Sequence, residues 1–188
     1  MKPKHPKAAK YSKSGFFKGV SNFDELEKKI SAMPETERGM AFEVFVEAWL
    51  NVIRQGKDVL PSNSIRPTLH KKLKLAGKST KEIGWDGVFT DINGEYAVYQ
   101  AKFRSGKTKL SWTELATSFA ATKRCPYPLC IITNLDRVTE DADNEDYFLI
   151  GKSVFSYTAL TKSICLNCLL HLNDSTIRTT WQPTDRND

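Results

Sequence analysis

The sequence predicts an α/β fold, and three observations carry this prediction. Apolar residues recur at helical spacing along residues 35–53. A hairpin follows at 87–103, where two strand-like runs are separated by an Asn-Gly turn signal. A second helical pattern at 111–122 then precedes a short apolar run at 129–133, which is typical of a buried central strand. Helices that alternate with strands in this way indicate an α/β domain.

The composition is that of an ordinary globular protein. The chain has 188 residues, of which 40% are hydrophobic and 27% are charged, enough for one domain with its own core. No apolar run approaches the ~20 residues that a membrane span needs, so we expect no membrane partner. The N-terminal region has no apolar stretch of the secretory type. Four cysteines in such a chain indicate reduced thiols and a cytoplasmic location.

The positive charge is concentrated in the first 20 residues. The net charge is +6, and residues 1–20 contain six lysines and no acidic residue. The remaining 22 basic residues equal the 22 acidic ones, so residues 21–188 are neutral overall. We therefore expect residues 1–20 to be a disordered basic tail. Such a tail either contacts nucleic-acid phosphates or serves as a solubilising leader.

Two helices are predicted next. A short amphipathic helix begins near Ser21 or Asn22 and ends before Pro34. The first core helix then covers 35–53 and shows a broad apolar face. Glu43 and Glu47 lie four residues apart on one side of this helix. We expect Glu47 to have no role in a site.

Residues 56–84 show no clear periodicity. We expect the first core strand within 65–76, although prolines and glycines interrupt the pattern. A basic cluster in this segment includes Lys71, Lys72 and Lys74. These lysines are candidates for contacts with DNA phosphates, and a plain solvated surface is the alternative.

The hairpin contains the residues that indicate chemistry. Asp86 begins the first strand, and Gln100 and Lys102 end the second, all at the end away from the turn. Because side chains alternate along a strand, Gln100 and Lys102 share one face and Ala101 points to the other. A carboxylate, an amide oxygen and an ammonium group suit a hard cation that assists attack on a phosphodiester.

A basic loop and a helix follow the hairpin. Arg104, Lys107 and Lys109 leave the second strand beside the proposed site and are candidate phosphate contacts. Ser111 and Glu114 form a capping-box pattern at the start of the next helix. The buried stripe expected along this helix comprises Trp112, Leu115, Ala116, Phe119 and Ala120.

Together, these motifs resemble the PD-(D/E)XK nuclease superfamily. Asp86 followed by Gln100-Ala101-Lys102 resembles its Asp … (Asp/Glu/Gln)-x-Lys signature, in the form of the Mrr-type branch, where Gln often replaces the second acid. The stretch from Gly39 to Glu43 resembles that branch's Gly-x-x-Phe-Glu opening. The resemblance covers roughly residues 36 to 160. It is strongest to the copies found at the N-terminus of helicase-type restriction and mobile-element proteins.

The resemblance implies an architecture. We expect a restriction endonuclease-like core with a mixed sheet of four to five strands flanked by helices, in the order αβββαβ. A single Mrr-like nuclease domain is expected at 21–175. Residues 176–188 are then a tail or the start of a linker to a motor domain.

The resemblance also implies a function, which is Mg²⁺-dependent DNA endonuclease activity with Mn²⁺ as a substitute. Asp86 would bind the ion directly, Gln100 would offer its side-chain oxygen and Ala101 its backbone carbonyl. Glu43 would complete the metal shell. Lys102 would hold the attacking water or steady the phosphate. The implied partners are DNA, a second copy of the chain in a homodimer, and an attached helicase motor.

Two alternatives stay open. The neutral Gln100 leaves less negative charge than a second acid, which predicts weaker metal binding and favours a DNA-binding module of the same fold without turnover. A protein-interaction module of a larger motor needs neither DNA nor metal.

Overall fold

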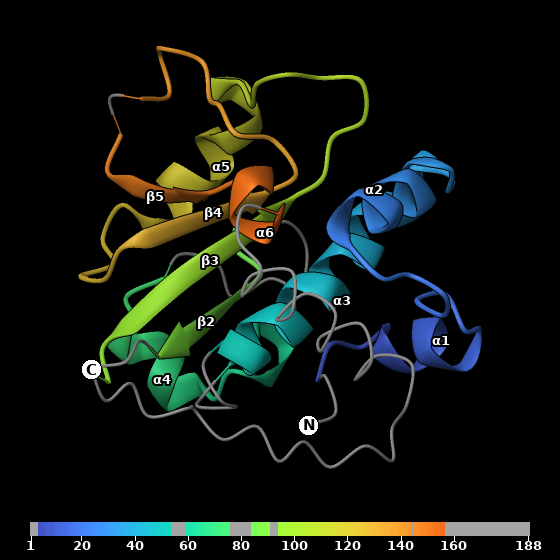
Figure 1. Ribbon diagram of the computed structural model, residues 1–188. Coiled ribbons are helices and arrows are strands. Elements are labelled where there is room, and N and C mark those ends of the chain that lie inside the picture. The colour runs from blue at the N-terminus through green and yellow to red at the C-terminus, as the bar shows by residue number, and fades with distance from the viewer. Residues whose placement is uncertain (1–3, 54–58, 76–83, 91–93, 144, 157–188) are drawn as a thin grey trace, which may run out of the picture.

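The structure is an α/β domain built on one mixed sheet. A computed structural model describes residues 4–53, 59–75, 84–90, 94–143 and 145–156. Its five-stranded sheet has the order β1-β2-β3-β4-β5 (Figure 1). The first three strands pair antiparallel, whereas β3, β4 and β5 are parallel to one another. The predicted fold class is therefore confirmed.

The elements follow one another in the expected order. The strands are β1 (Leu60–Pro61), β2 (Gly87–Thr90), β3 (Tyr96–Lys102), β4 (Leu129–Thr133) and β5 (Tyr147–Ile150). The helices are α1 (Ala8–Lys13), α2 (Phe23–Ser31), α3 (Glu35–Ile53), α4 (Pro67–Lys72), α5 (Trp112–Thr122) and α6 (Lys152–Ser156), with a 3₁₀ turn η1 at Ser62–Ser64. Apart from η1 and α4, which lie between β1 and β2, the succession α3-β1-β2-β3-α5-β4 is the predicted αβββαβ order. The predicted domain end at 175 and the tail 176–188 lie outside the described residues.

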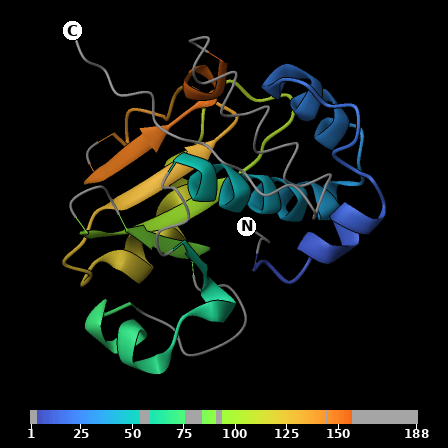
Figure 2. The ribbon, with the colours of Figure 1, turned by 60° about the horizontal axis from the view of Figure 1, so that its bottom comes forward.

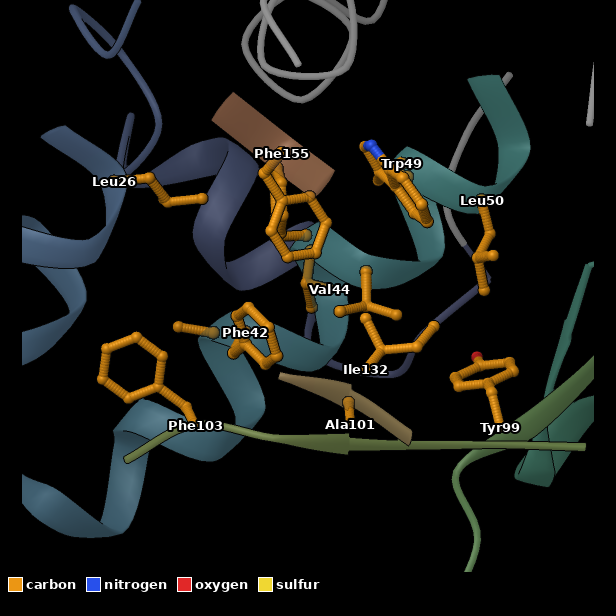
Figure 3. Packing of buried hydrophobic residues seen from close by; sticks show 14 of the residues in the cluster. Leu26, Phe42, Val44, Trp49, Leu50, Tyr99, Ala101, Phe103, Ile132 and Phe155 are labelled. Carbon is orange, nitrogen blue, oxygen red and sulfur yellow. The ribbon is translucent and has the colours of Figure 1, made fainter. Parts of the chain in front are cut away.

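One face of the sheet packs against α3. Tyr99, Ala101 and Phe103, at the end of β3, point toward this helix and meet side chains such as Phe42 and Leu50 (Figure 3). Helices α1, α2 and α6 extend the same hydrophobic cluster. Because alternate residues of a strand face opposite sides, this packing directs Gln100 and Lys102 away from α3.

The other face packs against α5 and α4. Val98 of β3 joins Leu115 and Ala121 of α5 in a second hydrophobic cluster. The buried positions of α5 are Leu115, Ser118 and Ala121. Trp112 is 40% exposed and Ala120 is also exposed, so their predicted places in the buried stripe are wrong. The first turn of α5 lies over the loop at Thr139 and Glu145, where the Trp112 backbone N–H and indole N–H form their hydrogen bonds.

The first strand does not lie where we expected it. β1 is only two residues long and precedes 65–76, and the middle half of that segment, Pro67–Lys72, is instead α4. Pro67 stands at the start of α4, where a proline fixes the backbone for a helix and no hydrogen bond is lost. Figure 2 shows α4 below the sheet, set apart from α3.

The N-terminal segment is also not the disordered tail that its lysines suggested. From residue 4 onward it is ordered, and Tyr11 and Phe17 are buried against the α2–α3 cluster. The rings of Phe16 and Phe17 meet edge to face at 5.0 Å. Lysine side chains can extend to the surface while their aromatic neighbours are buried. The number of lysines therefore did not predict whether this segment is ordered.

The helices α2 and α3 confirm their predictions. α3 has the predicted bounds, and Asn22 caps α2 by accepting the Glu25 N–H at 3.0 Å. Among the helices of the described residues, none is long and apolar enough to cross a membrane.

Candidate active site

Asp86 lies where the pairing of β2 with β3 ends. The last paired residues are Gly87 and Tyr99, and the Asp86 backbone N–H donates to the Tyr99 carbonyl at 2.8 Å. One Asp86 carboxylate oxygen, Oδ2, accepts the backbone N–H of Ala101 at 2.7 Å. On the other side, the Ser62 N–H donates to the Asp86 carbonyl at 2.7 Å. The Asp86 backbone is therefore held between β3 and η1, and its carboxylate is held at the open end of the β2–β3 ladder by the Ala101 N–H.

Gln100 contacts Asp86 directly. Its Nε2 donates to Asp86 Oδ2 at 2.5 Å and to the Ala101 carbonyl at 3.2 Å. Its Oε1 accepts from the hydroxyl of Ser118 on α5 at 3.3 Å. Gln100 is buried, so its orientation is set by these contacts rather than by solvent. We expected the side-chain oxygen to face the Asp86 side, but the amide N–H₂ faces it instead.

Lys102 lies on the same face of β3 as Gln100. It is half-buried, and burial lowers the pKa of its ammonium group. The Asp86 carboxylate opposes this shift. Lys102 is the last residue of β3, two residues after Gln100, so it lies at the same end of the β2–β3 ladder as Asp86.

Glu43 approaches the same place from α3. Burial raises the pKa of the Asp86 carboxyl, and the Glu43 carboxylate raises it further because two like charges disfavour each other. The Ala101 N–H, Lys102 and Gln100 all oppose this rise. Hydrogen bonds thus join Asp86 to Gln100 and to the Ala101 backbone, and the charges of Glu43 and Lys102 act on the pKa of Asp86 in opposite directions.

The donor set of this region fits a hard divalent cation. The carboxylates of Asp86 and Glu43 and the Ala101 carbonyl are oxygen donors of the kind that Mg²⁺ prefers. Asp86 Oδ2 and the Ala101 oxygen already converge on one partially positive group, the Gln100 amide nitrogen. Rotating that amide would present its oxygen instead, and the Ser118 hydroxyl can donate or accept in either orientation. Within the described residues, no three His, Cys, Asp or Glu side chains form a metal-binding group.

The basic loop after β3 is tied to α5. The Arg104 guanidinium pairs through Nε with Glu114 and donates from Nη1 to the Phe103 carbonyl at 2.8 Å. Lys107 Nζ lies 3.1 Å from the same Glu114 carboxylate. Lys109 is exposed and lines an open cavity of about 390 Å³ beside Asp136. Of the three predicted phosphate contacts in this loop, two therefore have an internal partner as well.

Glu114 holds this loop through its ion pairs with Arg104 and Lys107, and the charged form of its carboxyl group is strongly favoured. Burial alone would raise its pKa, but the Ser111 N–H, Arg104, Lys107 and the Ser111 hydroxyl outweigh burial and lower the pKa to about 2. A carboxylate with a lowered pKa stabilises the fold above its unfolded pKa, and this contribution is lost as the pH falls toward 2.

We expect Glu114→Gln to lower the free energy of unfolding by about 1 kcal/mol near neutral pH, since it removes the ion pairs with Arg104 and Lys107, whereas a Gln at this position can still complete the capping box. The deficit relative to the wild type should shrink as the pH is lowered from about 4.5 toward 2. Urea unfolding of both proteins between pH 2.5 and 7 measures this. A deficit that does not change with pH would contradict the assigned cause.

Of the lysines in the α4 region, Lys72 lies away from the site. Lys71, Lys72 and Lys74 are exposed, and Lys72 Nζ lies 5.0 Å from the centre of the Tyr96 ring. Tyr96 begins β3, four residues before Gln100, which corresponds to ~13 Å along a strand. If Lys72 contacts DNA, it contacts a part distant from the bond at the site.

Asn134 holds the chain just beyond Lys102. It is buried directly after β4, and its side chain accepts the Arg104 N–H at 2.8 Å and donates to the Arg104 carbonyl at 2.9 Å. The same amide donates to Glu27 of α2 at 2.8 Å. This clamp fixes the exit of β3 and so helps to position Lys102.

Sequence reasoning missed three residues around the site. Ser118 could have been noticed as a small polar residue on the buried face of α5. Glu47, expected to have no role, is fully buried and accepts two backbone N–H groups from the N-terminal segment. His5 contacts Glu43, and nothing in the local sequence indicates this because 38 residues separate the two.

Comparisons with known proteins give one structural likeness. No protein-family model matches the chain, and no curated protein matches it. Among solved structures, the chain is similar to the MspJI restriction endonuclease in complex with a 27-mer oligonucleotide, with 14% sequence identity and a TM-score of 0.44. The alignment covers 80% of this chain and 31% of that chain, so the present chain spans about a third of its length.

Proposed function

We propose that this chain is a Mg²⁺-dependent DNA endonuclease domain of the Mrr-type PD-(D/E)XK kind. The observation that supports this most is the contact of Asp86 with Gln100 and Ala101 at the open end of the β2–β3 ladder, with Lys102 on the same face. These hydrogen bonds support the proposal because sequence order alone does not guarantee that Asp86 contacts Gln100 and Ala101.

The proposed roles follow from the positions of the side chains. Asp86 and the Ala101 carbonyl would hold Mg²⁺ or Mn²⁺, with the Gln100 oxygen after rotation of its amide and with Glu43 directly or through water. When bound, the ion would supply an acidified water and offset charge on the phosphate. Lys102 would donate hydrogen bonds to the attacking water or to a phosphate oxygen.

The proposed nucleic-acid contacts form two groups. Arg104, Lys107 and Lys109 follow β3 directly and would reach phosphates beside the scissile bond. The α4 lysines would contact the backbone further along. A homodimer and an attached helicase motor are further proposals that rest on the family resemblance.

We expect Asp86→Asn to lower the rate of plasmid cleavage at least about 100-fold in Mg²⁺ or Mn²⁺, because a neutral amide binds a cation poorly. Asp146→Asn, which makes the same change at an exposed position, is the matched control and should cut like the wild type. The measurement is the conversion of supercoiled DNA to nicked and linear forms. Equal cutting by all three proteins would refute the proposal.

A DNA-binding module without turnover is the second candidate. It is favoured by the Gln100 amide, which satisfies Asp86 Oδ2 and the Ala101 carbonyl without any cation. Salt-sensitive DNA binding with no nicking in Mg²⁺, Mn²⁺ or Co²⁺ would select this candidate over the enzyme.

A further inference from the structure

We propose that His5 is a positioning residue of the candidate active site, which holds the Glu43 carboxylate, and that Glu47 fixes the N-terminal segment so that His5 reaches it. This inference rests on the proposed function, in which Glu43 completes the metal shell. It assigns a role to a segment that lies outside the motif-bearing part of the chain.

The clamp at Glu47 is the first step of the argument. Glu47 is fully buried on α3, where a carboxylate without partners would be costly. Its two oxygens accept the backbone N–H groups of Lys4 and His5, at 2.6 and 2.8 Å. These contacts use only backbone atoms of the N-terminal segment, so they fix where the chain runs and leave the His5 side chain for another contact.

The His5 imidazole makes that contact in a defined tautomer. The Lys7 N–H donates to His5 Nδ1 at 3.2 Å, so Nδ1 is the acceptor and the proton of the neutral ring is on Nε2. His5 Nε2 lies 3.0 Å from Glu43 Oε2 and therefore donates to it. The His5 side chain is only 12% exposed, so this donor faces the protein rather than the solvent.

The segment is held on its other side by α1. The His5 carbonyl accepts the Ala8 N–H at 3.0 Å, which begins the turn into this helix. Tyr11 is buried and its hydroxyl donates to the Glu37 carbonyl of α3 at 3.3 Å. Glu43 and Glu47 lie one helical turn apart on α3, so one stretch of chain contacts both.

One Glu43 oxygen is engaged by His5, which leaves the other for a cation or its water. Carboxylates that hold metals are commonly oriented by such a second hydrogen bond, and its loss typically costs 10–100-fold in metal affinity or activity. The orientation of the Glu43 carboxylate matters more here than usual. Because Gln100 is neutral, Glu43 is one of only two acidic side chains in the proposed donor set.

Two substitutions separate positioning from a merely structural role. In His5→Gln the amide N–H₂ can occupy the place of Nε2 and donate to Glu43. In His5→Asn the shorter side chain can still accept the Lys7 N–H, as Nδ1 does, but does not reach Glu43. The test is titration of each full-length protein with Mn²⁺ alone, followed by electron paramagnetic resonance, with wild type and Asp86→Asn beside them and thermal unfolding of all four.

We expect His5→Asn to weaken Mn²⁺ binding about 10-fold with an unchanged unfolding temperature, and His5→Gln to stay close to the wild type. The inference is overturned if His5→Asn binds Mn²⁺ like the wild type while Asp86→Asn does not, or if both His5 variants lose binding equally. Tighter binding in His5→Asn also overturns it, since His5 would then block Glu43. If the proposed function itself is wrong, the pattern is different, because wild type and Asp86→Asn then bind Mn²⁺ alike. That result overturns both the proposed function and this inference.

Discussion

Lys102→Ala is expected to lower the cleavage rate by about two to three orders of magnitude, as removal of a single transition-state donor does in other hydrolytic sites. DNA affinity measured in EDTA should change little, because one charge contributes only a small part of a phosphate-binding surface. Thermal stability should also be kept, since burial already lowers the pKa of Lys102 and its charge is unfavourable there. Single-turnover cleavage and fluorescence anisotropy measure the two effects separately.

The controls for Lys102 test its geometry as well as its charge. Lys102→Arg keeps the positive charge but introduces a larger planar group, so we expect it to restore little activity. Lys123→Ala removes an equal charge beyond the C-terminal end of α5, on the opposite end of that helix from Glu114, and should cut like the wild type. If Lys123→Ala were as defective as Lys102→Ala, bulk electrostatics and not a specific donor would explain the loss.

Gly87→Ala is expected to destabilise the fold by about 3 kcal/mol or more, the range of severe overpacking. A Cβ on Gly87 would lie 2.5 Å from the Leu60 carbonyl oxygen and 2.6 Å from the ring of Tyr99. The first of these atoms is backbone of the paired strand β1, and Tyr99 is fully buried, so neither can yield easily. Because Gly87 directly follows Asp86, strain at Gly87 would also act on the position of Asp86 in the site.

Gly39→Ala is the matched glycine control for this prediction. Gly39 lies in α3, where an added Cβ would meet only Glu43 Oε1, at 4.0 Å. Alanine is favoured over glycine inside a helix by about 1 kcal/mol, so this variant should be more stable than the wild type. Urea unfolding of both variants measures the contrast. A Gly87→Ala protein as stable as the wild type would contradict the close β1–β2–β3 packing.

Several parts of the fold follow from the local sequence. The bounds of α3 follow from apolar residues at helical spacing, and the Ser111–Glu114 capping box fixes the start of α5. Pairing of β2 with β3 follows from the hairpin pattern, and with it the approach of Asp86 to Gln100. These features depend on residues that are close along the chain.

Other features depend on contacts that periodicity does not encode. The orientation of the Gln100 amide is set by Ser118 on a different element, and the partner of Arg104 is a residue of α5. The ordering of the N-terminal segment depends on buried aromatic residues that outweigh its charge.

The sequence by itself thus determined the order of α3, β2, β3, α5 and β4, the α/β class and which residues of the hairpin face the same side. It could do so because these properties depend on side-chain alternation and helical periodicity within single elements. Only the tertiary structure decided that β1 precedes the basic cluster, that Glu47 is buried and that His5 reaches Glu43. These depend on how distant segments pack, because burial removes the solvent that would otherwise satisfy each polar group and so selects its partner.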